Sequence, residues 1–225
     1  MINPKLLTFL RSIKKNNNKI WYDEHKNEYR VLEDEFKSFL ESMRDEINSF
    51  DTKVKANHLK GIPTVKVFRL YRDTRFSNDK TKYKTAISGL ISADVKDPFE
   101  PVYYFAVEPG GNSFIGGGLR TPENDHLGSI REYIDVHYKE IQNILDNKNL
   151  KKHFPAGLSN EFKLKTSPQG YDIDHPAIDL LRYKNFTIGE RLSDAQLKDL
   201  RVKSYIVNKC EALAPINSFL RLAGK

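Results

Sequence analysis

The fold of this chain is decided by the stretch Val102-Tyr-Tyr-Phe-Ala-Val-Glu-Pro-Gly-Gly-Asn-Ser-Phe-Ile-Gly-Gly-Gly-Leu119. In its first part the odd-numbered residues from Tyr103 to Val107 would lie on one face of a strand and the even-numbered ones from Tyr104 to Glu108 on the other. Pro109-Gly110-Gly111 is typical of a tight turn, and residues 113–119 would form the returning strand. The stretch therefore predicts a β-hairpin.

Three further strands are predicted around this hairpin, at residues 64–72, 83–88 and 186–191, because apolar and polar residues alternate there with a period of two. In the first of these, the alternation separates Val65, Val67, Arg69 and Tyr71 from Lys66, Phe68, Leu70 and Arg72. Hairpin-spaced strands of this kind predict a mostly antiparallel sheet of about five strands.

Helices are predicted on both sides of the strand-rich part. Asn3-Pro4 is a helix start, and an apolar stripe from Trp21 to Ile47 indicates a second, longer helix. Thr121-Pro122-Glu123 would open a third helix with a break near residues 135–138.

The C-terminal part predicts two more helices. Pro176 would open a short one that ends at Leu181. Ser193-Asp-Ala-Gln196 has the spacing of a capping box and would start a last long helix. One face of that helix would hold Leu197, Leu200, Val207 and Cys210.

Together these elements predict an α+β fold in which the sheet packs against N-terminal, middle and C-terminal helices. Residues 1–225 are expected to form a single domain. It would consist of a helical part at about 4–49, a strand-rich part at about 64–119 and a second helical part at about 121–225.

Composition excludes several classes of protein. The chain has 225 residues, 39% of them hydrophobic, which is too apolar for a disordered chain. A single cysteine excludes an internal disulfide and a thiolate metal site. The longest apolar run, Val102–Val107, is far shorter than the roughly 20 residues of a membrane span, and no secretory signal is visible. We therefore expect a soluble, cytoplasmic protein without membrane contact.

Positive charge is concentrated in one segment. Residues 53–84 hold ten basic side chains against Asp73 and Asp79, a net charge of +8, whereas the whole chain carries +7. Such a segment favours a local site for anions. The alternative is a solvated face with ordinary ion pairs.

The strongest candidate binding site lies in this segment. Three guanidinium groups within seven residues supply forked donors that suit phosphate or carboxylate, and two carboxylates could hold them in place. The candidate ligand-binding residues are Arg69, Arg72, Asp73, Arg75, Asp79, Lys80 and Lys84. The competing interpretation is an ion-pair network that only closes the turn between two strands.

A second candidate is the run Asp172-Ile-Asp-His-Pro-Ala-Ile-Asp179. His175 and Asp179 are four residues apart at the start of a short helix, so their side chains could share a face and act as the catalytic acid and base. Alternatively, Asp174 and His175 only cap the helix. No further histidine or cysteine stands at metal-ligand spacing, so no metal site is expected.

Glycines flank the predicted returning strand at Gly110-Gly111 and Gly116-Gly117-Gly118. They do not form a phosphate loop, because no Gly-Lys-Ser/Thr follows. Glycine inside a strand indicates a bulge or the close approach of a backbone or a ligand. Arg120, directly beyond them, could point at a bound anion.

Four stretches carry a resemblance to a known family: Phe9-Leu-Arg-Ser-Ile-Lys-Lys-Asn-Asn-Asn18 with Trp21 and His25-Lys26; Phe68-Arg-Leu-Tyr-Arg-Asp-Thr-Arg-Phe-Ser-Asn-Asp-Lys-Thr-Lys-Tyr-Lys84; Glu108-Pro-Gly-Gly to Gly116-Gly-Gly-Leu119 with Arg131; and Gly170-Tyr-Asp-Ile-Asp-His-Pro-Ala-Ile-Asp-Leu-Leu181. From about Phe9 to Leu220 the chain resembles the bacterial and fungal family called domain of unknown function 2461. It departs from the family at Lys82, where proline is usual. The resemblance implies a single domain and brings no established activity, cofactor or catalytic residue.

Two functions from different classes compete. The first is an anion-binding pocket between sheet and helices for a phosphorylated or carboxylated small molecule, with His175 as the proton-transfer group of an enzyme. The second is a nucleic-acid-binding module that uses the basic 53–84 segment, with Tyr71, Phe76 and Tyr83 stacking on unpaired bases. A non-catalytic scaffold is the third option. The sequence leaves open whether the protein is an enzyme and which oligomer it forms, and no motif predicts a cofactor.

Overall fold

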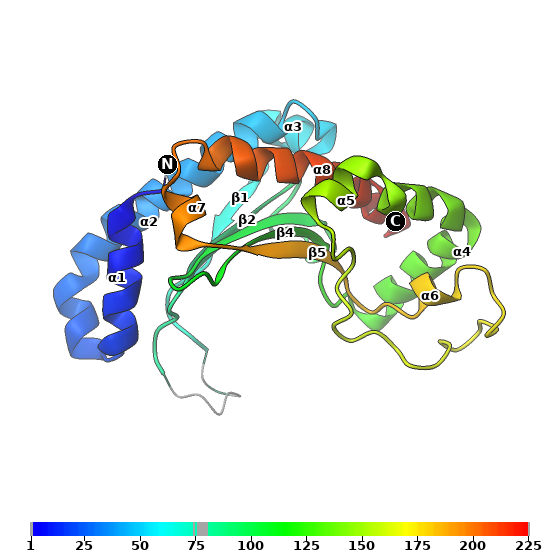
Figure 1. Ribbon diagram of the computed structural model, residues 1–225, viewed down its shortest axis with the longest axis horizontal. Helices are drawn as coiled ribbons and strands as arrows, with labels where there is room; N and C mark the ends of the chain where they lie inside the picture. Colours follow the sequence, from blue (N-terminus) through cyan, green and yellow to red (C-terminus); the bar gives the residue numbers. More distant parts are fainter. Residues whose placement is uncertain (1, 74, 76–80, 225) are drawn as a thin grey trace.

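The computed structural model describes residues 2–73, 75 and 81–224 and contains one five-stranded antiparallel sheet (Figure 1). Its strands, which neighbour one another in chain order, are β1 (Val65–Val67), β2 (Ile87–Ser92), β3 (Val102–Val107), β4 (Ser113–Leu119) and β5 (Phe186–Leu192). The helices of the described residues are α1 (Pro4–Lys15), α2 (Lys19–Ile47), α3 (Thr52–Leu59), α4 (Asn124–Asp146), α5 (Lys148–His153), α6 (Ile178–Leu181), α7 (Asp194–Lys198) and α8 (Val202–Ala223). The predicted α+β fold with an antiparallel sheet is confirmed.

The predicted hairpin is formed by β3 and β4, and Gly110 and Gly111 take positive φ angles of 87° and 75° in its turn. Two other strand predictions were wrong in their bounds. The strand expected at 83–88 lies at Ile87–Ser92, and the one expected at 64–72 is regular only over Val65–Val67. Beyond the sheet the described residues of the two segments pair again in an isolated bridge between Tyr71 and Tyr83.

The C-terminal helix differs from the prediction in one respect. The capping box at Ser193 is present, but it starts the five-residue helix α7, and Asp199 then adopts an extended conformation (φ −65°, ψ 137°). A new helix, α8, follows, and Leu200 between the two is 80% exposed and not on a buried face. Cys210 is fully buried, as predicted for a core residue. The expected break in α4 occurs at His137, whose φ and ψ are −112° and 26°.

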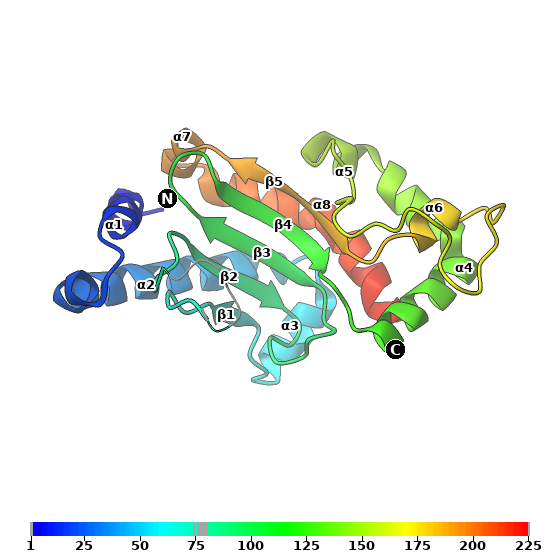
Figure 2. The same ribbon diagram turned by 90° about the horizontal axis from the view of Figure 1, so that it is seen from below.

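Helices α2 and α8 cover one face of the sheet. The Phe36 ring of α2 stacks on the Phe105 ring of β3, with the ring centres 5.9 Å apart. Leu213 of α8 packs over Gly117 of β4, and a Cβ added at Gly117 would lie 3.1 Å from Cδ1 of Leu213. No helix of the described chain lies in front of the opposite face, as Figure 2 shows. We call this opposite face the open face.

Glycines shape the open face. A Cβ at Gly189 would lie 2.2 Å from Cζ of Phe114, and one at Gly116 would lie 2.8 Å from Cε1 of the same ring. Both glycines therefore give the Phe114 ring the room to lie against the sheet. Glycine inside this strand was expected to indicate a bulge or the close approach of a backbone or a ligand. At Gly116 the packing of the Phe114 ring accounts for the glycine, and no ligand is needed to explain it.

A buried network of ion pairs and hydrogen bonds holds the C-terminal end of α8 against α3 and β3. The Asp51 carboxylate, 2% exposed, caps α3, accepts a hydrogen bond from the Tyr103 hydroxyl at 2.9 Å and lies 3.3 Å from Arg221 of α8. Arg221 also pairs with Glu100. Burial raises the pKa of the Glu100 carboxyl, and Arg221 opposes that shift. The network ties the end of α8 to α3 and β3.

Gly189→Ala should destabilise the protein by about 1–3 kcal/mol, because its Cβ would displace the Phe114 ring and meet the Ile115 carbonyl oxygen at 2.9 Å. Gly128→Ala is the matched control. Nothing lies within 4 Å of its Cβ position in α4, so it should stabilise by about 0.5–1 kcal/mol. Urea unfolding of both variants measures the difference, and a neutral Gly189→Ala would contradict the packing described here.

Candidate functional site

The basic hairpin, defined here as residues 69–73 and 81–84, leaves the sheet between β1 and β2 and projects from it on the side of the open face (Figure 1). Two backbone hydrogen bonds hold its sides together, from Arg72 N–H to the Lys82 carbonyl at 2.9 Å and from Lys84 N–H to the Leu70 carbonyl at 2.8 Å. This pairing brings charged side chains that are far apart in the sequence to one end of the sheet.

The base of the basic hairpin is attached to the α1–α2 junction. The Asn17 side chain binds both the backbone N–H and the carbonyl of Tyr83, at 3.0 and 2.9 Å. The Tyr22 ring stacks on Tyr83 at 4.4 Å, and the Tyr83 hydroxyl donates to that of Tyr71. Burial raises the pKa of the Tyr83 hydroxyl above its usual value. These contacts explain why residues 83–86 leave the sheet instead of forming the predicted strand.

Three predicted ligand-binding residues lie together at this end of the sheet. Burial lowers the pKa of the Lys84 ammonium, and the positive charges of Arg72 and Arg69 lower it further. The Lys84 ammonium lies 5.8 Å from the centre of the Phe68 ring, and that of Lys66 lies 5.5 Å from the same ring. Lys66 also belongs to this cluster, although it was not among the residues predicted to bind a ligand.

Arg75 and Asp73 form a local pair. The Arg75 guanidinium donates to Asp73 through Nε at 3.0 Å and Nη2 at 2.7 Å, and both side chains are more than half exposed. Hydrogen bonds from Arg75 lower the pKa of the Asp73 carboxyl. For these two residues the geometry matches the ion-pair interpretation. Asp79 and Lys80 lie outside the described residues.

Arg120 is separated from the basic hairpin. It follows the far end of β4, is well exposed, and its Nη2 lies 3.5 Å from the Glu161 carboxylate. The β3–β4 register places the two ends of β4 at opposite ends of the sheet, so Arg120 does not join the cluster around Lys84.

His175 and Asp179 also lie away from the basic hairpin. The segment that contains α6 lies at one end of the molecule, and the basic hairpin lies well apart from it, at the other end of the sheet (Figures 1 and 2). Asp179 is 80% exposed and faces Arg182 at 3.4 Å and Lys163 at 3.9 Å. The structure therefore pairs His175 and Asp179 neither with each other nor with the arginines of the basic hairpin.

Both ring nitrogens of His175 have partners. The Ala177 N–H donates to Nδ1 at 3.1 Å, which assigns the ring proton to Nε2, and Nε2 donates to the Asp135 carboxylate of α4 at 2.8 Å. Arg131, one turn earlier in α4, donates through Nε to the Leu181 carbonyl at 2.9 Å. These bonds attach the 170–181 segment to α4 and leave His175 without a nitrogen lone pair for a substrate.

An aromatic row that the sequence reasoning missed crosses the open face. It consists of Phe68, Tyr104 and Phe114, whose ring centres are 6.4 Å apart in the first pair and 6.2 Å in the second. All three side chains are partly exposed. Arg191 of β5 lies directly opposite Phe114 in the register and donates to Asn112 at 2.5 Å. The period-two alternation already separated Tyr104 from the core residue Tyr103, which was the signal available.

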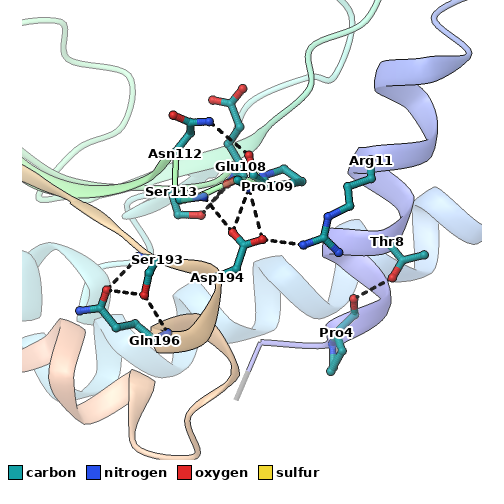
Figure 3. Close-up of polar contacts among 12 residues, drawn as sticks. Pro4, Thr8, Arg11, Glu108, Pro109, Asn112, Ser113, Ser193, Asp194 and Gln196 are labelled. Atoms are coloured by element: carbon teal, nitrogen blue, oxygen red, sulfur yellow. Dashed lines mark hydrogen bonds and ion pairs between the residues drawn. The ribbon is translucent and has the colours of Figure 1, made fainter.

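Asp194 binds the β3–β4 turn, at the end of the sheet from which the basic hairpin leaves (Figure 3). Its carboxylate accepts hydrogen bonds from the backbone N–H groups of Gly110 and Gly111 at 3.0 and 3.1 Å and pairs with Arg11 of α1 at 2.5 Å. The backbone amides of the two turn glycines thus bind a carboxylate of the protein itself. Asp194 joins α1, the β3–β4 turn and α7.

Two hollows lie elsewhere on the surface. One of about 670 Å³ is lined by α1 and α2, and one of about 450 Å³ lies among α4, α5 and α8. Neither is lined by a predicted site residue. Among the described residues, no three histidine, cysteine, aspartate or glutamate side chains are placed to share a metal ion. None of the described helices has the length and apolar character to cross a membrane.

A family model described as "Conserved hypothetical protein (DUF2461)" matches residues 5–219, nearly the whole chain. The chain belongs to this family. The match confirms the resemblance inferred from the basic hairpin and the three other stretches. No curated protein and no solved structure matches the chain. The family description names no activity, so any function has to be argued from the geometry.

Asp194→Asn should lower the free energy of unfolding at neutral pH by about 1–3 kcal/mol, because the charged acceptor of two amides and Arg11 is lost. Burial alone would raise the pKa of Asp194, but the amides of Gly111 and Gly110 and the Arg11 charge lower it below 3.8. Its stabilisation is therefore complete above that value and is lost as the pH falls through the lowered pKa.

Urea unfolding at about pH 7 and about pH 3 tests this. The difference between wild type and Asp194→Asn should shrink in acid. Asp34→Asn, on the exposed side of α2, is the control and should change little at either pH. A wild-type to Asp194→Asn difference that is equal at both pH values would contradict the role of the charge.

Proposed function

We propose that the protein binds an anionic ligand on the open face of its sheet, at the end where the basic hairpin leaves it. The binding groups are the side chains of Lys66, Arg69, Arg72 and Lys84. Of the residues expected from the sequence, this proposal keeps Arg69, Arg72 and Lys84, to which it adds Lys66. It leaves out the Asp73–Arg75 pair, Arg120 and His175.

One observation carries the proposal: the ammonium groups of Lys66 and Lys84 share the Phe68 ring, at 5.5 and 5.8 Å from its centre, on a face that no described helix covers. Burial lowers the pKa of the Lys84 ammonium, and the charges of Arg72 and Arg69 lower it further. Like charges repel each other, so an anion bound beside Lys84 would relieve that repulsion.

The proposal concerns binding and not catalysis. The candidate general base, His175, uses both ring nitrogens within the protein, and its 170–181 segment is attached to α4, away from the basic hairpin. A ligand on the open face would therefore meet cations and aromatic rings. Recognition by charge is the chemistry that these side chains supply.

Lys66→Gln combined with Lys84→Gln should weaken the binding of inorganic tripolyphosphate by about tenfold or more, because two charged contacts are removed. Isothermal titration calorimetry measures the affinity. Lys152→Gln combined with Lys165→Gln removes the same charge from exposed positions outside the site and should leave the affinity within about twofold. Equal losses in the two double variants would show that only net charge matters and would refute the site.

A further inference from the structure

The open face carries more than charge. From one side to the other, the cations Lys66 and Lys84 are followed by the rings of Phe68, Tyr104 and Phe114, and then by Arg191. The register explains this order. Phe68 donates its N–H to the Ser88 carbonyl, Ser88 pairs with Ala106, Ala106 with Phe114, and Phe114 with Arg191. A single line of side chains therefore runs across the whole sheet.

Small residues lie beneath the rings. Ser88 and Ala106, the two residues between Phe68 and Phe114 in this line, are only 8% and 7% exposed, and Tyr104 from the neighbouring position contacts both rings. Beyond Phe114, Gly116 and Gly189 add no side chain. The three rings therefore lie over small residues, and all three are partly exposed.

A face built from rings and cations suits one kind of polymer. Aromatic side chains stack on unpaired bases without regard to sequence, while neighbouring lysine and arginine side chains bind the phosphates. Neighbouring rings are tilted against each other by 49° and 54°. Bases that stack on them must lie at different angles, which a flexible single strand allows and the parallel base pairs of a duplex do not.

We propose that the anionic ligand of the open face is single-stranded nucleic acid, with bases stacked on Tyr104 and Phe114 and phosphates bound by Lys66 and Lys84 beside Phe68 and by Arg191. This inference rests on the proposed anion-binding function and names its ligand class. A small anion would need only the lysine and arginine groups of the proposed anion site. The aromatic row and Arg191 at its far end extend the site to several nucleotides.

Fluorescence anisotropy with labelled single-stranded oligonucleotides of about 12 nucleotides, DNA and RNA, tests the proposal. Tyr104→Leu should weaken binding by about tenfold or more while polyphosphate binding stays the same, because leucine fills the space but does not stack. Phe162→Leu, at an exposed ring outside the site, is the matched control and should change neither. The affinity should fall with salt with a logarithmic slope of about −2, as expected for three phosphate contacts.

The outcomes separate the two proposals. If oligonucleotide and polyphosphate bind equally and Tyr104→Leu changes neither, or if duplex DNA binds as tightly as single strands, the nucleic-acid inference is refuted and the anion site stands. If no anion binds, both are refuted. Should Tyr104→Leu fail to fold, ultraviolet cross-linking of the wild-type protein decides. Adducts on peptides with Phe68, Tyr104 or Phe114 support the inference, and adducts only elsewhere refute it.

Discussion

The described helices pack against one face of the sheet only, and the rest of the molecule follows from that constraint. Helices α2 and α8 approach so closely that glycine is needed beneath them, at Gly89 under Leu40 and at Gly117 under Leu213. Burying that face supplies the core, since hydrophobic burial is the main favourable contribution to folding. The other face is left to meet solvent or a ligand, and it carries small residues, three rings and cations. A one-sided antiparallel sheet permits this division, because successive side chains point to opposite faces.

Polar anchors then place the segments that surround the open face. Asn17 holds the backbone of Tyr83, Asp194 holds the β3–β4 turn and Arg11, and Asp51 with Arg221 fixes the end of α8. Each anchor satisfies buried or half-buried donors that would otherwise cost free energy. Asn17 and Asp194 hold the end of the sheet from which the basic hairpin leaves, whereas Asp51 and Arg221 hold α8 against α3 and β3. The groups that anchor this end of the sheet are thus separate from the lysine and arginine groups that we propose to bind a ligand.

Much of the fold could be predicted because its signals are local. The β3–β4 turn, the capping box at Ser193 and the break in α4 each follow from a few adjacent residues. The errors have long-range causes: residues 83–86 leave the sheet because Asn17 takes the backbone groups of Tyr83. In the candidate site, charge counting found the lysine and arginine cluster. The partner of His175 proved to be Asp135, which lies 40 residues away, and no spacing rule reveals such a contact.

The open face of the sheet is the surface that we propose binds the ligand of this protein. Backbone amide chemical shifts recorded during a titration with a single-stranded oligonucleotide can locate the binding surface, because they report every region of the chain at once. We expect the largest changes at residues 66–68, 84, 104–106, 114–116 and 189–191, all on or beside that face. Changes confined to the hollow between α1 and α2, or to the 170–181 segment, would contradict it.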